Sequence, residues 1–392
     1  MSRLGWIFSA AVAVLGLHAI DDVASGGPLR AGFAALAVAA VAVVTFERLR
    51  PALQAGLAGS LGVLGLVNGA MHVGHLRAGD GIAGGDLTGV AVALAGAVLV
   101  GLAIAIPLVR RHEPRPRALA RVVAVPAGLV TLLLFVAPVS LAIMDTHKWR
   151  EPIGPAPAGW QDVATRGVQC WYHPSRTGAA VLVLHGGGGD REGAFRHAEL
   201  FAEHGYGVLV FDEPGRGKSG GEPNSWGWNW RPAADRALDW LERQPGVDRT
   251  RVAGLGLSTG ADVLLDLAAD RDLAAVVGDG AAATSWEDGR RIGTPPLEAA
   301  AGWVMFQSIG LFSGDDQPRP LADRAARITE PLLLVSAGNT AERDFSALYA
   351  RTARGPAEHW NLPDVAHTDG LEAEPDAYAR HVLGFVGRAL GG

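Results

Sequence analysis

The segment Gly256-Leu257-Ser258-Thr259-Gly260 places a serine between two glycines, a pattern typical of a reactive hydroxyl group held on a sharp turn. Apolar residues lead into it from Val252, and Ala261–Ala269 behind it has the composition of a helix. A strand, turn and helix in this order predict a nucleophile elbow, in which flanking glycines avoid collisions with neighbouring elements. With 53 glycines in the chain, such a string also arises by chance, so its context decides its meaning.

A serine hydroxyl must lose a proton before it attacks a carbonyl group, and a histidine is the usual base. His367 is the candidate, because it lies in a predicted loop after the last predicted strand, His359–Leu362. A carboxylate must orient that imidazole, and Glu342 and Asp344 both follow the predicted strand Leu332–Ala337. The residues themselves leave the choice between these two acids open.

The negative charge that develops on the substrate oxygen needs hydrogen-bond donors placed in advance. The amide of Thr259 follows from the elbow. A second amide is expected from the run His185–Gly189, where Gly187 is the first candidate and Gly188 the alternative. Glycine lets the backbone approach a tetrahedral centre closely, so this run predicts an oxyanion hole.

Short apolar runs alternate with helical stretches through the second half of the chain, which predicts a mostly parallel sheet with helices on both faces. An antiparallel strand region, Val163–His173, is expected to open it. In such sheets, sites lie beyond the carboxyl ends of the strands. The remaining expected strands are Val181–Leu184, Gly207–Asp212, Val252–Gly256, Ala274–Gly278, Leu332–Ala337 and His359–Leu362.

Four segments in this half resemble the α/β-hydrolase superfamily: His185–Gly189, Asp212–Gly221, the elbow around Ser258, and Val365–Gly370. Among them, Asp212–Gly221 resembles the Asp-x-x-Gly-x-Gly-x-Ser signature of these enzymes. The domain is similar to dienelactone-hydrolase-like and prolyl-oligopeptidase-like serine hydrolases over about residues 160–390. The resemblance implies an α/β-hydrolase fold, a triad of serine, acid and histidine, and no cofactor. Some relatives carry a glutamate at the place of Glu342, so Glu342 is expected as the acid and Asp344 as the alternative.

The first part of the chain is far more apolar than the rest and contains five runs near the roughly 20 residues that a membrane-crossing helix needs. They are rich in small residues, which let membrane helices pack closely. A multi-pass helical domain is therefore predicted over residues 1–146, with the lipid bilayer as a partner. The runs are Leu4–Ile20, Leu29–Phe46, Ala52–Met71, Leu87–Val109 and Val122–Met144.

Arginines are unevenly distributed among the loops that join these runs. Two loops on the side of the N-terminus hold seven arginines, Arg48, Arg50, Arg110, Arg111, Arg115, Arg117 and Arg121. The opposite loops hold only Arg30 and Arg77. Positive loops face the cytoplasm, and five crossings then place the second half of the chain on the extracytoplasmic side.

Polar residues end the first and third apolar runs, at the same predicted side of the membrane. Histidine and aspartate at these spacings could share a metal ion, because His72 and His75 are neighbours on one helical face. The candidates are His18, Asp21, His72 and His75. The alternative is that they lie at the headgroup boundary and pair with one another.

The soluble part is predicted to begin after a proline-rich linker, residues 147–159, and to fill residues 160–392. Residues 284–322 interrupt the alternation of strands and helices, where hydrolases of this kind insert a cap. Four aromatic residues of this insertion are candidates for an apolar acyl pocket, or belong to the core of the cap: Trp286, Trp303, Phe306 and Phe312.

The net charge of −6 argues against a nucleic-acid partner, and the single cysteine excludes an intramolecular disulfide and a cysteine-based zinc cluster. The sequence thus predicts a membrane-anchored serine hydrolase for a small-molecule, lipid or peptide substrate. Two other functions compete with it: a non-catalytic binding or sensory protein on a hydrolase scaffold, and transport or metal chemistry in the membrane helices.

Overall fold

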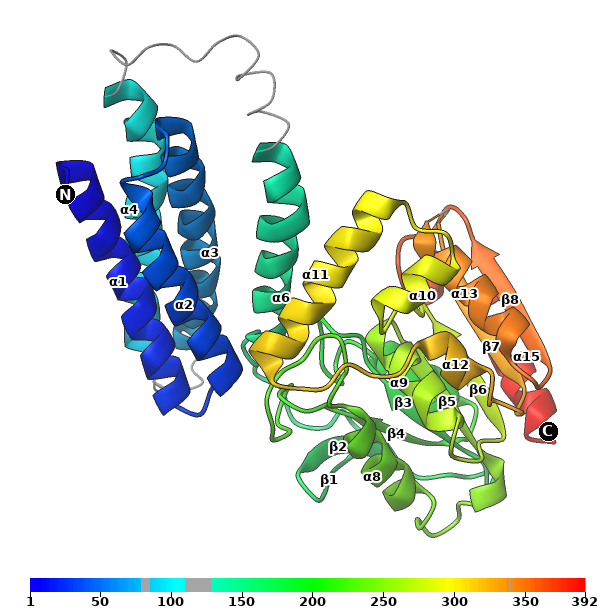
Figure 1. Cartoon of the computed structure of the whole chain (residues 1–392). Helices are drawn as coiled ribbons and strands as arrows, with labels where there is room; N and C mark the ends of the chain where they lie inside the picture. Colours follow the sequence, from blue (N-terminus) through cyan, green and yellow to red (C-terminus); the bar gives the residue numbers. More distant parts are fainter. Residues whose placement is uncertain (79–84, 110–127, 339, 392) are drawn as a thin grey trace. The chain divides into compact units, whose positions relative to one another are not determined.

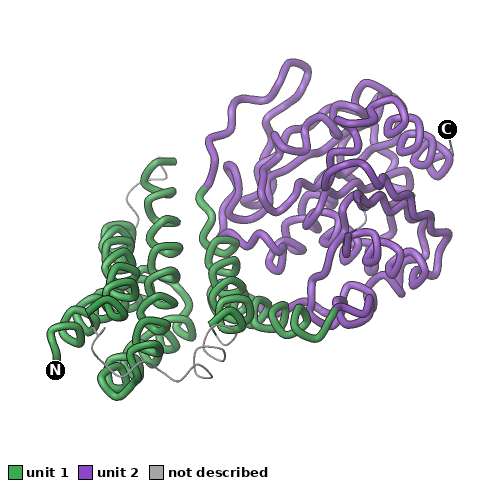
Figure 2. Tube along the Cα trace, turned by 90° about the horizontal axis from the view of Figure 1, so that it is seen from above, with its two compact units in different colours: residues 1–149, 295–315 green, residues 150–294, 316–392 purple. Residues whose placement is uncertain are grey.

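A computed structural model of the chain describes residues 1–78, 85–109, 128–338 and 340–391 (Figure 1). The chain forms two compact units, which Figure 2 distinguishes by colour. The first unit comprises residues 1–149 and 295–315, and the second comprises residues 150–294 and 316–392. The second unit is therefore interrupted by a segment that belongs to the first.

The first unit is built from apolar helices, and five helices within the described residues are long and apolar enough to cross a membrane. The last of them, Gly128–Thr146, contains a π-helical stretch, η1 (Leu132–Val136), followed by α6 (Ala137–Thr146). Large apolar side chains such as Phe33 and Leu94 point outward and are 70% and 67% exposed. The other four are α1 (Arg3–Ala24), α2 (Leu29–Phe46), α3 (Pro51–Ala78) and α4 (Asp86–Val109).

Glycines allow α3 and α4 to pack with their backbones close together. A Cβ atom on Gly62 would lie 2.8 Å from the amide nitrogen of Val100, and one on Gly96 would lie 2.7 Å from that of Leu66. Helix association of this kind relies on small residues at the contact. Nearer the amino end of α1, the rings of Phe8 and Phe46 stack with centroids 3.8 Å apart.

The helix α11 (Pro296–Ser313) belongs to the first unit, where it packs against α6 and η1. The Arg30 guanidinium donates to the carbonyl oxygen of Gly314 at 3.0 Å. The expected cap, residues 284–322, is therefore not a single body, because its middle joins the apolar helices. The arginine-rich loop with Arg110, Arg111, Arg115, Arg117 and Arg121 lies outside the described residues.

The second unit has an eight-stranded sheet in the order β1-β2-β4-β3-β5-β6-β7-β8. β1 and β2 form an antiparallel hairpin, β2 pairs antiparallel with β4, and all other neighbours are parallel. The strands are β1 (Gln161–Thr165), β2 (Val168–His173), β3 (Ala180–Leu184), β4 (Gly207–Phe211), β5 (Val252–Leu257), β6 (Ala275–Asp279), β7 (Leu332–Ala337) and β8 (Ala357–Leu362). The expected strand region and the six later strands all correspond to strands here; Leu332–Ala337 coincides with β7, and the others differ by at most two residues at either end.

Helices cover both faces of this sheet, as continuous apolar strands require. α7 (Phe195–Glu203) and α15 (Pro375–Ala389) pack on the face that presents Val181, Val183 and Leu255. α9 (Thr259–Ala268) packs on the other face, where the side chain of Leu264 fills the space beside Gly254. It contacts α8 (Arg231–Leu241) and α12 (Leu321–Ala325), which in turn contacts α13 (Ala341–Thr352). The short helices α10 (Trp286–Arg291) and α14 (Gly370–Ala373) lie in connecting segments.

The proline-rich segment before β1 is hydrogen-bonded to the rest of the second unit. Gly154 donates its amide to Glu192 Oε1 at 3.0 Å, and Ala156 donates to Asp162 Oδ2 at 3.0 Å. Lys218 Nζ donates to the carbonyl oxygen of Gly154 at 3.2 Å. These contacts hold the predicted linker, residues 147–159, against the sheet-containing unit over part of its length.

Candidate active site

Ser258 occupies a strained turn between β5 and α9. Its backbone has φ 52° and ψ −123°, one of three positive φ values at non-glycine positions among the described residues. A Cβ atom on Gly256 would lie 2.3 Å from the carbonyl oxygen of Gly260, and one on Gly260 would lie 2.5 Å from that of His185. Both positions therefore require glycine, because other backbone segments lie too close for a Cβ atom. Strain of this kind persists only where the surrounding structure fixes it.

The Ser258 hydroxyl lies within hydrogen-bond distance of an imidazole, and the imidazole contacts a carboxylate in turn. His367 Nε2 is 2.9 Å from Ser258 Oγ, and His367 Nδ1 is 2.6 Å from Glu342 Oε2. Glu342 is in the first turn of α13, and its other oxygen accepts the amide of Ala337 at 2.7 Å. Asp344 pairs instead with the neighbouring Arg343. Of the two candidate acids, the structure thus brings Glu342 to the imidazole.

The surroundings of His367 favour its protonated form. The hydrogen bond to Glu342 is the main cause that raises the pKa of His367 above its usual 6.5, and partial burial opposes it. The imidazole fits beside Gly280, where a Cβ atom would lie 2.7 Å from His367 Cε1. The arrangement can hold a proton taken from the serine, because a nearby carboxylate stabilises the imidazolium ion.

Two buried acids contribute to the field around His367, and the sequence patterns did not indicate them. Asp279 ends β6, its carbonyl oxygen accepts the Ser258 amide at 2.7 Å, and Tyr378 Oη donates to its Oδ2 at 2.7 Å. Asp262 lies in α9 and accepts the amide of Ala282 at 2.8 Å. Burial raises the pKa of Asp279 to about 7 and that of Asp262 to about 8. A polar residue at the carboxyl end of a buried strand was the available signal for Asp279.

The glycine run after β3 is held in place by side chains on both sides. His185 Nδ1 donates to the carbonyl oxygen of Gly186 at 2.8 Å, while its Nε2 accepts the amide of Glu213 at 3.1 Å. The buried Arg216 donates to the carbonyl oxygen of Gly187 at 2.7 Å. Since the Gly187 carbonyl and the Gly188 amide share one peptide plane, this contact also sets the direction of the Gly188 N–H.

A Cβ atom has no space at Gly187, where it would lie 2.1 Å from the carbonyl oxygen of Ser225 and 2.7 Å from Thr259 Oγ1. The hydroxyl group of Thr259 donates to the same Ser225 oxygen at 2.8 Å. Thr259 is also the first residue of α9, so its amide is one of the first-turn donors that have no partner within a helix. The glycine run and the elbow therefore meet at Ser225.

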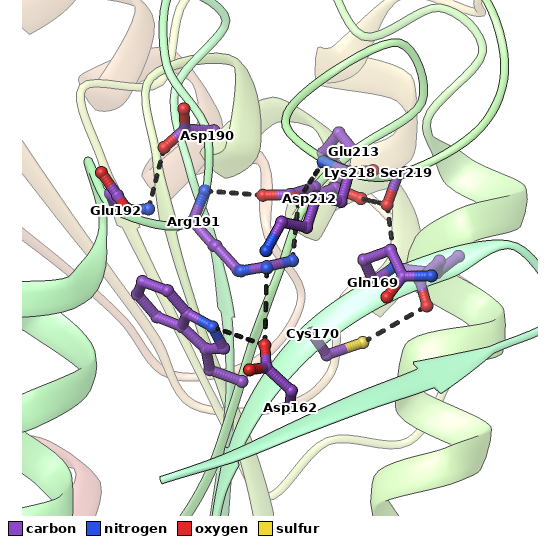
Figure 3. Close-up of polar contacts among 12 residues, drawn as sticks. Asp162, Gln169, Cys170, Asp190, Arg191, Glu192, Asp212, Glu213, Lys218 and Ser219 are labelled. Atoms are coloured by element: carbon purple, nitrogen blue, oxygen red, sulfur yellow. Dashed lines mark hydrogen bonds and ion pairs between the residues drawn. The ribbon is translucent and has the colours of Figure 1, made fainter. Parts of the chain in front are cut away.

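The signature around Asp212 ties the loop after β4 to Arg191 and to Gln169 (Figure 3). Asp212 Oδ1 accepts the amide of Arg191 at 3.0 Å, and its Oδ2 accepts the Arg191 guanidinium and the Lys218 amide, each at 2.8 Å. Ser219 Oγ donates to the Asp212 carbonyl oxygen at 2.6 Å and accepts the amide of Gln169 at 2.8 Å. Both polar residues of the signature, the aspartate and the serine, thus have structural partners, and Arg216, from the same loop, reaches the glycine run.

The four aromatic candidates for a substrate pocket are divided between the two units. Trp286 lies in α10 of the second unit, where the Arg290 guanidinium stacks over its ring. Trp303, Phe306 and Phe312 lie on α11 of the first unit. Phe306 is buried, and the ring of Phe312 contacts that of His147, 6.3 Å away between centroids. An acyl pocket formed by these residues stays a prediction.

The polar candidates at the ends of the apolar helices are brought together in part. His18, Asp22 and His72 each offer a possible metal ligand, and these atoms lie within 4.8 Å of one another. Asp21, one of the four candidates, accepts a hydrogen bond from Thr88 Oγ1 at 2.6 Å. His75 Nε2 is 2.9 Å from the carbonyl oxygen of His147.

The strand order, the strained serine turn and the Ser258–His367–Glu342 contacts define the class of the second unit as a hydrolase with an α/β-hydrolase fold. Residues 169–369, slightly more than half of the chain, match the family model described as X-Pro dipeptidyl-peptidase (S15 family). The chain belongs to the S15 family.

Two proteins from strains of Mycobacterium tuberculosis, both described as uncharacterized, are each 32% identical over 210 residues, which span 51% of this chain and 67% of theirs. An esterase of Pyrococcus furiosus matches 58% of this chain and 91% of its own at 22% identity, with a TM-score of 0.48. A proline iminopeptidase of Mycobacterium smegmatis matches 59% and 98% at 16% identity, with a TM-score of 0.43.

Proposed function

We propose that this hydrolase is a serine hydrolase, in which Ser258 is the nucleophile, His367 the general base and Glu342 the residue that orients His367. The observation that carries the proposal is the unbroken set of contacts from Ser258 Oγ to His367 Nε2 and from His367 Nδ1 to Glu342 Oε2. Three residues from three separate segments of the chain meet in the order that such a mechanism needs.

The reaction follows from these positions. Ser258 Oγ attacks the substrate carbonyl carbon while its proton passes to His367 Nε2, and the carbonyl π electrons move onto the oxygen. The imidazolium ion then gives that proton to the leaving alcohol or amine as the carbon–leaving-group bond breaks, which leaves an acyl-enzyme. A water molecule, deprotonated by the same imidazole, releases the acid and restores Ser258.

The oxyanion of the tetrahedral intermediate would be bound by the Thr259 amide together with an amide from Gly187 or Gly188. The contacts that support this are the crowding of Gly187 against Ser225 and the Arg216 hydrogen bond to the Gly187 carbonyl oxygen, because both fix the loop before substrate arrives. Donors fixed in advance avoid a reorganisation cost during the reaction, and one of them is worth about 3 kcal/mol of barrier.

The substrate would carry an ester or amide acyl bond. The family is described as X-Pro dipeptidyl-peptidase, so an X-Pro nitroanilide is the first amide to compare with a short nitrophenyl ester. Hydrolysis of both, with the amide preferred, would indicate a peptidase. Hydrolysis of the ester alone would indicate an esterase.

Labelling with a fluorophosphonate tests the mechanism directly, because the probe reacts only with an activated serine. We expect the full chain to be labelled at Ser258, with the label absent in Ser258→Ala and in His367→Ala. Each single variant should lose several orders of magnitude in nitrophenyl acetate hydrolysis, and the double variant should be little worse, since the residues act as one unit. A folded Ser258→Ala protein with most of its activity would refute the mechanism and favour a binding role.

We also propose that the five apolar helices anchor the enzyme in a membrane, with the hydrolase unit on the extracytoplasmic side. The outward-facing apolar side chains and the arginine bias between loops support this. Ala158 is exposed in the segment before β1. Ala158→Cys, in a Cys170→Ser background, should react with a membrane-impermeant thiol reagent in intact cells. Labelling only after lysis would place the hydrolase unit in the cytoplasm.

A further inference from the structure

Three helices of the first unit bring a polar cluster together at one end. The cluster consists of residues from the last turns of α1, from the carboxyl-terminal part of α3 and from the first turn of α4. His18 and Asp86 are each 3% exposed, and the His72 side chain is 12% exposed. The members of this polar cluster are His18, Asp21, Asp22, Asn68, His72, Asp86 and Thr88.

The hydroxyl proton of Thr88 determines where the His18 ring carries its own proton. Thr88 Oγ1 donates to the carboxylate of Asp21 at 2.6 Å and is also 2.9 Å from His18 Nδ1. A hydroxyl group has one proton, and the short contact with a charged acceptor takes it. His18 Nδ1 must then donate to Thr88 Oγ1, which leaves a lone pair on His18 Nε2.

That lone pair faces other acceptors. His18 Nε2 is 3.2 Å from Asp22 Oδ2 and 3.3 Å from Asn68 Oδ1. A nitrogen lone pair, a carboxylate oxygen and an amide oxygen repel one another at this range unless a proton or a cation lies between them.

His72 is oriented in the same way. Its Nδ1 is 3.1 Å from Asp86 Oδ1, which gives this nitrogen the ring proton and leaves Nε2 as an acceptor. His72 Nε2 is buried and has no hydrogen-bond partner among the described residues. The ring occupies space that glycine provides, because a Cβ atom on Gly89 would lie 2.3 Å from His72 Cγ. An imidazole whose far nitrogen donates to a carboxylate is the usual arrangement of a metal-binding histidine.

We propose that His18, Asp22 and His72 bind one divalent transition-metal ion of the zinc type, with the Asn68 amide oxygen as a fourth ligand. Two imidazoles and one carboxylate are the donor set of zinc sites and of related non-haem metal sites. The ligand atoms of the three residues lie within 4.8 Å of one another, close enough to share a single ion. Asp86 and the Thr88–Asp21 pair hold the two rings from outside the site. The Asp22 side chain is 31% exposed, which gives an ion a path to the site.

The alternative on the same contacts is a protonated His18 that donates to Asp22 and binds no metal. The two cases differ in stoichiometry, which can be measured on the full chain in detergent after tag removal. The protein is treated with a chelator, dialysed against Zn²⁺ and then freed of unbound metal before metal analysis. We expect one zinc ion per chain in the wild type, and none above background in His18→Ala, Asp22→Ala and His72→Ala.

His75→Gln is the matched control, because this residue lies one helical turn from His72 in α3 and contacts the carbonyl oxygen of His147 instead. It should keep the bound zinc. Asp86→Asn keeps all ligands and weakens only the support of His72, so it should raise the Kd for zinc by about 10- to 100-fold and shift the visible spectrum of the Co²⁺-loaded protein. Size-exclusion elution like that of the wild type shows that a variant is folded.

A wild-type chain that holds no zinc after this treatment would overturn the proposal in favour of the protonated pair. Zinc retained by folded His18→Ala and His72→Ala proteins, or lost from His75→Gln alone, would place the metal elsewhere. None of these outcomes depends on Ser258 or on hydrolysis.

Discussion

Glu342 Oε2 lies 2.6 Å from His367 Nδ1, whereas Asp344, two residues further along α13, forms its ion pair with Arg343. Glu342→Gln should therefore lower kcat/KM by up to about 10⁴-fold, because a neutral amide no longer stabilises the imidazolium ion. Glutamine can still accept the Ala337 amide, so the turn should be retained. Asp344→Asn is the control and should leave kcat near the wild-type value. A larger loss of activity in Asp344→Asn than in Glu342→Gln would assign the orienting role to Asp344.

The pH dependence of hydrolysis should report His367. Neutral imidazole is the active form, so kcat/KM rises as the pH passes the pKa of His367. Since the contact with Glu342 raises that pKa, the rise should be centred above 6.5 in the wild type. In Glu342→Gln, the main interaction that raises the pKa of His367 is lost. The midpoint of the pH profile of the remaining activity should therefore lie at a lower pH than in the wild type. A profile centred at the same pH in both proteins would show that Glu342 does not set the protonation of the base.

Two glycines in one loop offer a matched test of the oxyanion proposal. Gly187→Ala would place a Cβ atom 2.1 Å from the Ser225 carbonyl oxygen, so the loop must move and activity should fall by about 10²-fold or more. Gly189→Ala meets its nearest atom at 4.0 Å and should be active. The comparison is made by steady-state kinetics on both variants, with thermal unfolding to show that they are folded. Equal activity of the two variants would mean that Gly187 is not part of the oxyanion site.

Glu213 should make the protein less stable as the pH rises. Both of its carboxylate oxygens are buried with no hydrogen-bond partner among the described residues, and burial raises its pKa well above the usual 4.5. Between 4.5 and the raised value, the folded protein binds more protons than the unfolded chain, so the free energy of unfolding decreases with increasing pH.

The measurement is the difference in Tm between Glu213→Gln and the wild type. Glutamine has no charged form, so this difference should become more positive from about pH 5 to about pH 8. The exposed Glu203→Gln serves as the control and should show a constant difference. A difference for Glu213→Gln that does not change with pH would mean that Glu213 has the same pKa in the folded and the unfolded protein, as a solvated carboxylate does.

The sequence was sufficient for the parts of the site that depend on local geometry. Gly256 and Gly260 prevent collisions within one turn, so the type and spacing of a few residues indicate a serine elbow. The choice between Glu342 and Asp344 depended on where α13 begins. Residues two apart on a helix differ in direction by about 200°, so only one of the two can face His367. A sequence pattern alone does not fix that register.

Contacts between distant elements were beyond the sequence pattern. Asp279 and Tyr378 meet only because α15 packs on the sheet beside β6. The aromatic residues of α11 were expected in a cap, since the helix lies between two strands of the sheet in the sequence. Its apolar composition does not reveal which apolar surface covers it, and the structure pairs it with α6 and η1.

The chain passes between the two units three times, after residues 149, 294 and 315. The ribosome therefore completes α6 first, then all of β1 to β6, and only then α11. At roughly 5–20 residues per second, α6 waits on the order of ten seconds for its partner helix. During that interval β1 to β6 have been synthesised, but the chain has not yet returned to the first unit. If residues 1–149 are deleted, α11, in which Phe306 and Ile309 are buried, loses α6 and η1, the helices that it contacts. A truncated protein that begins after residue 149 therefore contains an apolar helix, α11, without the helices that cover it in the full chain.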